Sequence, residues 1–225
     1  MSETSELPNR LFVVSAPSGT GKTTLNRRLS STFEEVSLAV SHTTRAIRDG
    51  EKDGVHYHFV SVEQFKQKII NEDFLEWAEV HSNFYGTSLG ELRRLNDLGQ
   101  IPILEIDVQG WLLCRPKIPD ALAVFILPPT LEDLWKRLKS RGTDSLETIW
   151  LRLQNAYREI EIASNYNYFI VNDSLDAAFD ELKSIVIDGQ RGKINEAKGQ
   201  ELCEKLKEEY KNADWIQGLR AQIQC

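Results

Sequence analysis

Short apolar runs alternate with amphipathic segments along most of the chain. Four runs have the composition and length of buried strands, at residues 11–14, 101–107, 121–127 and 168–171. Amphipathic segments follow these runs and predict helices at residues 25–29, 130–142, 145–163 and from 176 onward. Strands that alternate with helices favour an α/β fold with a parallel sheet and right-handed crossovers.

Residues 41–91 depart from this alternation and predict a small, mainly β insertion. Apolar and polar positions alternate just before it at 36–40 and within it at 54–60, which indicates strands. A helix is expected over about 61–71, because Ser61 with Gln64 three residues later matches a capping box.

Beyond about residue 189 the chain becomes a charged, helical extension. Its apolar residues recur at helical spacing, at Leu202, Leu206, Tyr210, Ala213, Trp215, Ile216, Leu219 and Ile223. The stripe is consistent with a stabilising appendage or with a surface for self-association, and the sequence leaves both open.

Composition narrows the classes of partner. The net charge of −7 argues against a general nucleic-acid or anionic-membrane surface, so an anionic ligand must meet local basic clusters. The three cysteines, Cys114, Cys203 and Cys225, are far apart and favour a reducing compartment. The polar N-terminus is no secretory signal, and the longest apolar run, 121–127, is too short to span a bilayer. We therefore expect a soluble cytoplasmic protein with no nucleic-acid or membrane partner.

A glycine-rich segment joins the first predicted strand to the first helix. Gly19, Gly21, Lys22 and Thr23 match the phosphate-loop pattern G-x-x-x-x-G-K-[ST], except that Ala16 stands at the first glycine. The loop amides and the helix N-terminus would bind phosphate, Lys22 would reach the β- and γ-phosphates, and the Thr23 hydroxyl would hold Mg²⁺. An ordinary glycine-rich turn before a helix is the alternative.

Two groups of arginines suggest further anion sites. Arg45 and Arg48 share a polar loop between Ser41 and Tyr57, and without acids nearby they would repel each other unless a dianionic phosphate lies between them. The alternative interpretation of these two arginines is a basic loop that is simply exposed to solvent.

The second group is on the predicted helices of 130–163. Arg137 and Arg141 are one turn apart, and Arg152 is on the next helix. Such a helix pair could act as a lid that brings its arginines to a transferred phosphoryl group. A solvated helix face is at least as good a description of these positions taken alone.

Taken together, the ordered motifs resemble guanylate kinase over about residues 9–188. They are SAPSGTGKTT at 15–24, SHTTR at 41–45, Arg48, GVHY at 54–57, FLEW at 74–77, YGT at 85–87, EIDVQG at 105–110, LPP at 127–129, RGT at 141–143 and VND at 171–173. Ala16 is a common variant in that family. The departures are Ile47 and Asp49, where prolines are common, and Trp111, where a small residue is common.

The resemblance implies a P-loop NTPase core with a parallel sheet flanked by helices, a small mainly-β GMP-binding insertion and a helical lid. The core would comprise 9–40, 92–130 and 164–188, the GMP-binding region 41–91 and the lid 131–163, followed by the extension 189–225. It also implies Mg²⁺-dependent transfer of the ATP γ-phosphoryl group to GMP, by a monomer or a homodimer.

The resemblance assigns roles residue by residue. Ser41 and Glu76 would bind the guanine base, and the GMP phosphate and its pocket would involve Arg45, Arg48, Tyr57, Tyr85, Gly86 and Thr87. Asp107 would lie between GMP and Mg²⁺, with Glu105 near the metal and Thr23 as a further ligand. The ATP site would comprise Ala16, Pro17, Ser18, Gly19, Thr20, Gly21, Lys22, Thr23, Thr24 and, near adenine, Asn172; the catalytic residues would be Lys22, Arg45, Arg137, Arg141 and Arg152.

Other interpretations have less support. Kinase-like scaffold modules that bind phosphopeptides usually lack an intact phosphate loop, and Ser41 with Glu76 disfavours a kinase for another base. His56 and His58 have a strand spacing that can share a metal, but packing or surface roles are favoured. Cys114 is expected to be buried rather than reactive.

Overall fold

The structure is a computed structural model that describes residues 7–8, 10–80, 82–140, 142, 144–190, 192 and 196–223. Its contacts divide the chain into two compact units. The first comprises Ser30–Ala121 together with the chain up to Val13, and the second comprises Val14–Leu29 and Leu122–Cys225. Among the described residues, no helix combines the length and the apolar composition needed to cross a membrane.

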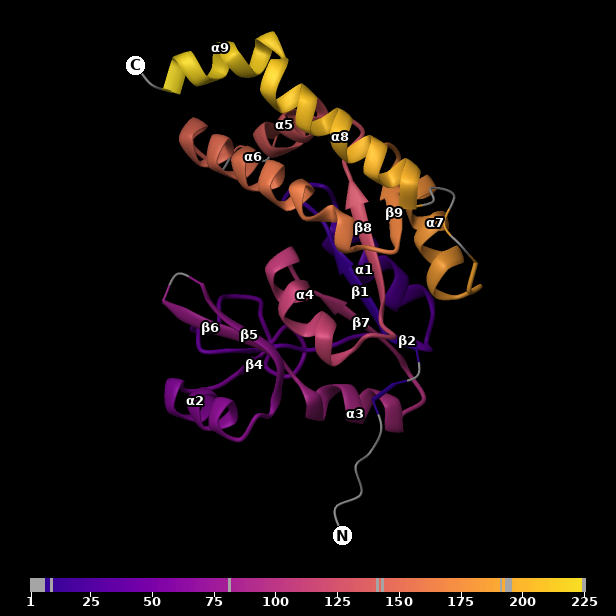
Figure 1. The fold of residues 1–225 in the computed structure, drawn as a ribbon. Helices are drawn as coiled ribbons and strands as arrows, with labels where there is room; N and C mark the ends of the chain where they lie inside the picture. The colour runs from indigo at the N-terminus through magenta and orange to yellow at the C-terminus, as the bar shows by residue number, and fades with distance from the viewer. Residues whose placement is uncertain are drawn as a thin grey trace. The chain divides into compact units, whose positions relative to one another are not determined.

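The parallel sheet of an α/β fold is present, flanked by helices (Figure 1). Its strand order is β2-β7-β1-β8-β9, and both β2–β7 and β8–β9 pair in parallel. The central positions of β1, β7, β8 and β9 are buried, as the apolar runs predict. The strands are β1 (Phe12–Ser15), β2 (Val36–Leu38), β7 (Ile101–Glu105), β8 (Leu122–Leu127) and β9 (Tyr168–Val171).

A second, four-stranded sheet lies in the first unit, where the sequence predicts a mainly β segment. Its order is β4-β3-β6-β5, with β5 and β6 joined as an antiparallel hairpin. The helix beside it has the predicted capping box, in which Ser61 and Gln64 satisfy each other's backbone N–H groups. The elements are β3 (His42–Thr43), β4 (His58–Phe59), α2 (Val62–Ile70), β5 (Phe74–Val80), β6 (Asn83–Ser88) and α3 (Leu89–Asp97).

Three sequence-based expectations about the first unit need correction. The strand predicted at 54–60 is reduced to β4, because residues 54–56 form a turn and only an isolated bridge joins Asp53 to Tyr57. The strand predicted over 101–107 ends at Glu105, and helix α4 (Val108–Cys114) follows it, since the Asp107 carboxylate caps that helix. Helix α3 has no counterpart in the prediction, although Ser88 caps it. A short 3₁₀ turn, η1 (Arg115–Lys117), follows α4.

The second unit carries most of the first helix, the predicted lid helices and the C-terminal extension. Helix α8 runs beside α5 and α6 (Figure 1). The extension is helical as expected, and its buried stripe includes Cys203, Leu206, Tyr210, Ile216 and Leu219. The elements are α1 (Lys22–Thr32), α5 (Leu131–Ser140), α6 (Leu146–Glu161), η2 (Ala163–Asn165), α7 (Leu175–Val186), α8 (Glu196–Asn212) and α9 (Asp214–Ile223).

Close packing of α8 on β9 depends on Gly199. A Cβ added at Gly199 would overlap Cδ2 of Phe169, whose ring is fully buried. Replacing Gly199 by alanine must therefore displace either the ring or the helix, and such overpacking costs about 1–3 kcal/mol.

We expect Gly199→Ala to lower the melting temperature by roughly 2–4 °C for each kcal/mol lost, measured by scanning calorimetry. The matched control is Gly218→Ala in α9, where an added Cβ would meet nothing within 4 Å. That change should raise the stability slightly, because alanine favours a helix by about 1 kcal/mol over glycine. Equal effects of the two substitutions would contradict this packing.

Candidate functional site

The glycine-rich loop lies between β1 and α1, and α1 begins at Lys22. Gly19 and Gly21 have φ angles of 94° and 101°, in the left-handed region that favours glycine. Space is limited as well, since a Cβ would lie 2.7 Å from Leu138 Cδ2 at Gly19 and 2.6 Å from Asn172 Nδ2 at Gly21. Both glycines are therefore required by conformation and by packing.

Asn172 links this loop to helix α5. Its side-chain Nδ2 donates a hydrogen bond of 2.6 Å to the carbonyl oxygen of Thr20. Its own carbonyl oxygen accepts from Nη2 of Arg137 at 2.7 Å. Asn172 is 4% exposed, so it supports the loop from within the fold, and the adenine contact that the sequence suggests for it stays a prediction.

The predicted lid arginines have different surroundings. Arg137 on α5 contacts the residue that supports the loop, as described above. Arg152 on α6 forms an ion pair with Asp144, with Nη1 and Oδ2 2.6 Å apart. Arg141 lies outside the described residues.

Lys22 is half-buried at the start of α1, and Thr23 and Thr24 are exposed beside it.

The first unit contains a cavity of about 240 Å³ that brings together most residues predicted to bind the acceptor and the metal. It lies where the hairpin β5–β6, the end of β7 and the start of α4 meet. The site predictions that line it are Ser41, Tyr57, Glu76, Tyr85, Gly86, Glu105 and Asp107. Thr87 is buried directly behind this wall.

Glu76 is the most unusual residue of the cavity, because it is an acidic residue that is only 8% exposed. Its Oε1 accepts a hydrogen bond of 2.8 Å from the backbone N–H of Thr87, its cross-strand partner in the hairpin. Burial, helped by the negative charge of Asp107, raises the pKa of Glu76 although the hydrogen bonds of Thr87 oppose this. A buried acceptor of this kind favours a ligand that brings N–H donors.

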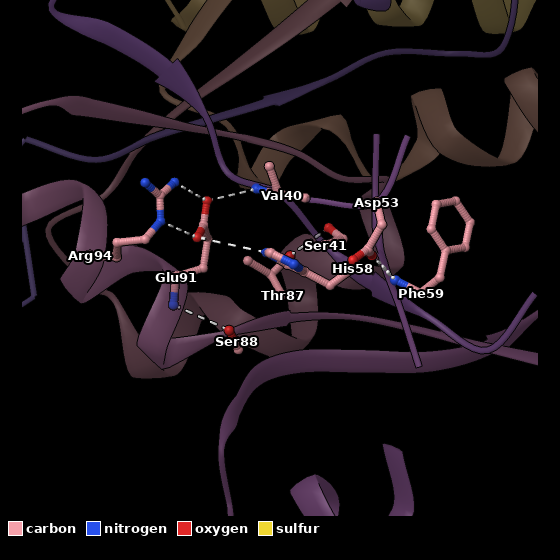
Figure 2. Close-up of polar contacts among 9 residues, drawn as sticks. All are labelled: Val40, Ser41, Asp53, His58, Phe59, Thr87, Ser88, Glu91 and Arg94. Carbon is pink, nitrogen blue, oxygen red and sulfur yellow. Dashed lines mark hydrogen bonds and ion pairs between the residues drawn. The ribbon is translucent and has the colours of Figure 1, made fainter. Parts of the chain in front are cut away.

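A network behind the cavity wall holds the backbone beside Ser41 (Figure 2). The Glu91 carboxylate accepts from the N–H of Val40 at 3.1 Å and forms two hydrogen bonds with the Arg94 guanidinium, at 2.8 and 2.9 Å. The hydroxyls of Ser41 and Thr87 are 3.1 Å apart. Burial of Glu91 opposes ionisation, but the bonds from Arg94 and Val40 outweigh it and lower the pKa.

Sequence reasoning missed Glu91, although a signal for it exists. Ser88 accepts a hydrogen bond from the Glu91 N–H and caps α3, and serine followed three residues later by glutamate is a helix-start pattern. That pattern predicts a helix start, but the contact with Val40, 51 residues away, depends on tertiary structure.

The expectation that Arg45 and Arg48 lie without acids nearby is wrong. Arg45 Nη2 is 2.7 Å from Glu51 Oε1, and Glu51 Oε2 accepts from the N–H of Arg48 at 2.8 Å. The hydrogen bonds from Arg45 and Arg48 lower the pKa of Glu51 to about 2. The loop folds back on itself, so Glu51 orients the Arg45 guanidinium, which also lies over the ring of Tyr57 at 5.6 Å.

Two residues apart in the strand predicted over 101–107, Glu105 and Asp107 would face the same side of that strand, and this expectation is wrong. Strand β7 ends at Glu105, so the two carboxylates do not share a strand face. Asp107 is instead the N-cap of α4, and its Oδ1 accepts from the Gly110 N–H at 2.8 Å. Both residues nevertheless line the same cavity.

Comparison with known proteins adds an independent finding. The sequence model of the family described as guanylate kinase matches residues 8–188. The chain belongs to the guanylate kinase family. The match spans the glycine-rich loop, the cavity and both predicted lid helices, and it ends before α8.

Individual guanylate kinases are similar over most of their length. The chain is 41% identical over 202 residues to guanylate kinase of Clostridium perfringens strain SM101, covering 87% of this chain and 94% of that protein. It is 49% identical over 176 residues to guanylate kinase of Neisseria gonorrhoeae, covering 78% and 86%. The crystal structure of guanylate kinase from Anaplasma phagocytophilum matches with a TM-score of 0.61 and 33% identity, covering 82% and 87%.

Because the pKa of Glu76 is raised, we expect the folding stability of the protein without bound substrate to depend on pH. Below about pH 4.5, where an ordinary glutamate is protonated, the carboxyl is neutral in both the folded and the unfolded chain. As the pH rises above this value the unfolded chain loses its proton first, so folding stability falls until the pH exceeds the raised pKa. Glu76→Gln keeps an oxygen for the Thr87 N–H and removes the charge.

We therefore expect Glu76→Gln to melt at a higher temperature than the wild type at pH 7, with a difference that disappears as the pH falls to 4.5. Thermal melts from pH 4 to pH 8 measure this. The control is Glu79→Gln at an exposed position of β5, which should melt like the wild type at every pH. If the wild type melted at a higher temperature than Glu76→Gln at pH 7, burial of the Glu76 charge would not be destabilising and the prediction would be wrong.

Proposed function

We propose that the chain is an ATP:GMP phosphotransferase, in which the cavity of the first unit binds GMP and the glycine-rich loop of the second binds ATP. Family membership supports the activity. The observation that supports the choice of GMP is the Glu76 carboxylate, buried in a cavity beside the Ser41 and Thr87 hydroxyls.

The donors and acceptors of guanine complement this cavity. Guanine presents N1–H and a 2-amino group, which a carboxylate accepts, and an O6 acceptor, to which a hydroxyl donates. Glu76 and Ser41 provide these groups, and the N–H of Thr87 keeps the Glu76 carboxylate in place. Adenine has no N1–H and would leave the buried carboxylate without a donor, which gives the site its selectivity.

The GMP phosphate is the proposed ligand of the arginine loop. Arg45 and Arg48 would neutralise it, and the hydroxyls of Tyr57 and Tyr85 would donate hydrogen bonds to it. Glu51 supports the proposal because it holds the Arg45 guanidinium and the Arg48 backbone in place before a phosphate binds. Such preorganisation lowers the entropic cost of binding.

The triphosphate is proposed to bind the loop at residues 16–24, with Lys22 on the β- and γ-phosphates. Arg137, Arg141 and Arg152 would stabilise charge on the transferred group. Arg152 would have to leave Asp144 to do so, which fits a lid that changes conformation as it closes. No strong general base is needed, because the GMP phosphate is itself a nucleophile. Closure of the insertion and the lid would align the two substrates and exclude water.

Mg²⁺ is the proposed metal, and the available groups suit it. Thr23, Glu105 and Asp107 offer only oxygen donors, which Mg²⁺ prefers, and Mg²⁺ commonly keeps several waters beside one or two carboxylates and substrate phosphates. When bound with ATP it neutralises the charge that develops during transfer. Glu105 and Asp107 support this assignment because both line the cavity in which GMP is proposed to bind.

We also propose a cytoplasmic location. Cys114 and Cys203 are free and buried, and burial raises the pKa of each thiol to about 12, so they behave as packing residues that suit a reducing compartment.

A coupled assay that measures ADP formation tests the proposed reaction. With ATP and Mg²⁺ we expect kcat/KM for GMP to exceed that for AMP, CMP or dTMP by roughly 10³-fold or more, because a site built to hydrogen-bond one base rejects another strongly. Lys22→Ala should lower kcat by roughly 10²-fold or more, since it removes charge stabilisation in the transition state.

The control for Lys22→Ala is Lys66→Ala, at an exposed position of α2, which should leave kcat unchanged. Equal turnover of AMP would contradict the assignment of the base site. A folded wild type that turns over no nucleotide but binds phosphopeptides would contradict the proposed activity and favour a scaffold role.

A further inference from the structure

The C-terminal helices α8 and α9 lie beyond the residues that match the guanylate kinase family model, yet they make specific contacts with both predicted lid helices. Helices α5, α6, α8 and α9 all belong to the second unit. Figure 1 shows α8 running beside α5 and α6. These contacts are polar and aromatic at α5 and mainly aromatic at α6.

A single carboxylate of α8 caps α5. Glu209 Oε2 accepts a hydrogen bond of 2.8 Å from the N–H of Leu131, and Oε1 accepts one of 3.0 Å from the N–H of Glu132. The next N–H, that of Asp133, donates to the Thr130 hydroxyl at 3.0 Å. The first N–H groups of a helix have no partner within the helix, and its N-terminus favours negative charge. Glu209 thus supplies from 78 residues away the cap that α5 needs.

An aromatic cluster attaches α6 to the same helix. The Tyr210 ring, next to Glu209, stacks on Tyr157 at 4.3 Å and on Trp150 at 6.1 Å between centroids. Arg220 of α9 lies over the Tyr210 ring at 4.9 Å. Trp135 of α5 contacts Trp215 of α9 with centroids 6.3 Å apart. Stacked aromatic pairs and cation–π contacts favour fixed relative positions of the helices that carry them.

Helix α5 is also the helix that contacts the glycine-rich loop. Leu134 and Leu138 pack where Gly19 has no side chain, and Arg137 donates to the carbonyl oxygen of Asn172, which in turn supports the loop. The position of α5 along its axis therefore sets both the wall beside the loop and the position of the Arg137 guanidinium.

We propose that α8 and α9 hold α5 and α6 as one rigid body, and that Glu209 is a positioning residue which sets α5, and with it Arg137, against the ATP-binding loop. This inference rests on the proposed function only in taking ATP as the ligand of the loop. Glu209 acts through α5 and contacts no reacting group.

The proposal differs measurably from a purely stabilising role. An appendage that only stabilises the fold changes the folded fraction, and therefore the amount of active enzyme, without changing either KM. A residue that positions α5 changes the ATP side selectively, because Arg137 and the loop belong to that side. The GMP cavity is built from residues of the first unit, so its KM serves as an internal reference.

The test uses the full chain with Glu209→Ala and Glu209→Gln. The matched control is Glu208→Ala, which removes the same charge from an exposed neighbour whose contacts, to Lys211 and Asn212, stay within α8. Steady-state kinetics with ATP and GMP are measured well below the melting temperature of each variant, and ATP affinity is measured separately by calorimetry without GMP.

We expect Glu209→Ala to raise the KM and the Kd for ATP about 3- to 10-fold, which is within the free energy that loss of a helix cap typically costs. The KM for GMP should stay within about two-fold of the wild-type value. Glu209→Gln, which keeps one oxygen acceptor, should give a smaller rise in the KM and the Kd for ATP. Glu208→Ala should match the wild type in all three constants. Unchanged ATP constants in Glu209→Ala, or equal rises in both KM values, would overturn the proposal. If the wild type did not phosphorylate GMP, the proposed function would fail, and the ATP Kd series would still decide this inference.

Discussion

An ionised carboxylate removed from water must be met by hydrogen-bond donors, and this constraint at Glu76 organises the cavity of the first unit. One donor comes from the chain itself, the N–H of Thr87, across the β5–β6 hairpin. The hairpin closes this tightly because Gly86 has no side chain, since a Cβ there would lie 2.8 Å from the Glu76 carbonyl oxygen. Further donors must come from a ligand, and guanine carries them on adjacent atoms.

The supports of both proposed substrate sites follow a common physical rule, in which a glutamate carboxylate accepts from backbone N–H groups of a short segment and holds that segment in place. Glu91 holds the backbone before Ser41, Glu51 holds the arginine loop, and Glu209 caps the helix beside the phosphate loop. Glu91 and Glu209 accept from N–H groups 51 and 78 residues away, whereas Glu51 accepts from the N–H of Arg48, three residues before it. Such bonds are short-ranged and directional, so they position the binding groups before substrate arrives.

Local signals in the sequence predicted the buried strands of the parallel sheet, the capped helix α2 and the glycine-rich loop, because burial pattern and capping depend on neighbours within a few residues. The same reasoning failed at residues 54–60, where alternation suggested a strand but the chain turns. It also misplaced Asp107, which caps α4 instead of extending β7. The motifs named most of the residues that line the cavity. The contacts of Glu91 with Val40 and of Glu209 with α5 depend on tertiary folding, and the local contact of Glu51 with the arginine loop was missed.

We propose that the buried Glu76 carboxylate accepts hydrogen bonds from the N1–H and the 2-amino group of guanine. This central claim is tested most directly by calorimetric titration of the wild type and Glu76→Gln with GMP and with inosine 5′-monophosphate, which lacks only the 2-amino group. A hydrogen bond to a charged group contributes about 1.5–3 kcal/mol, so the wild type should bind GMP roughly ten-fold or more tightly than the inosine nucleotide. In Glu76→Gln that ratio should fall close to one. An unchanged ratio in the variant would contradict the account.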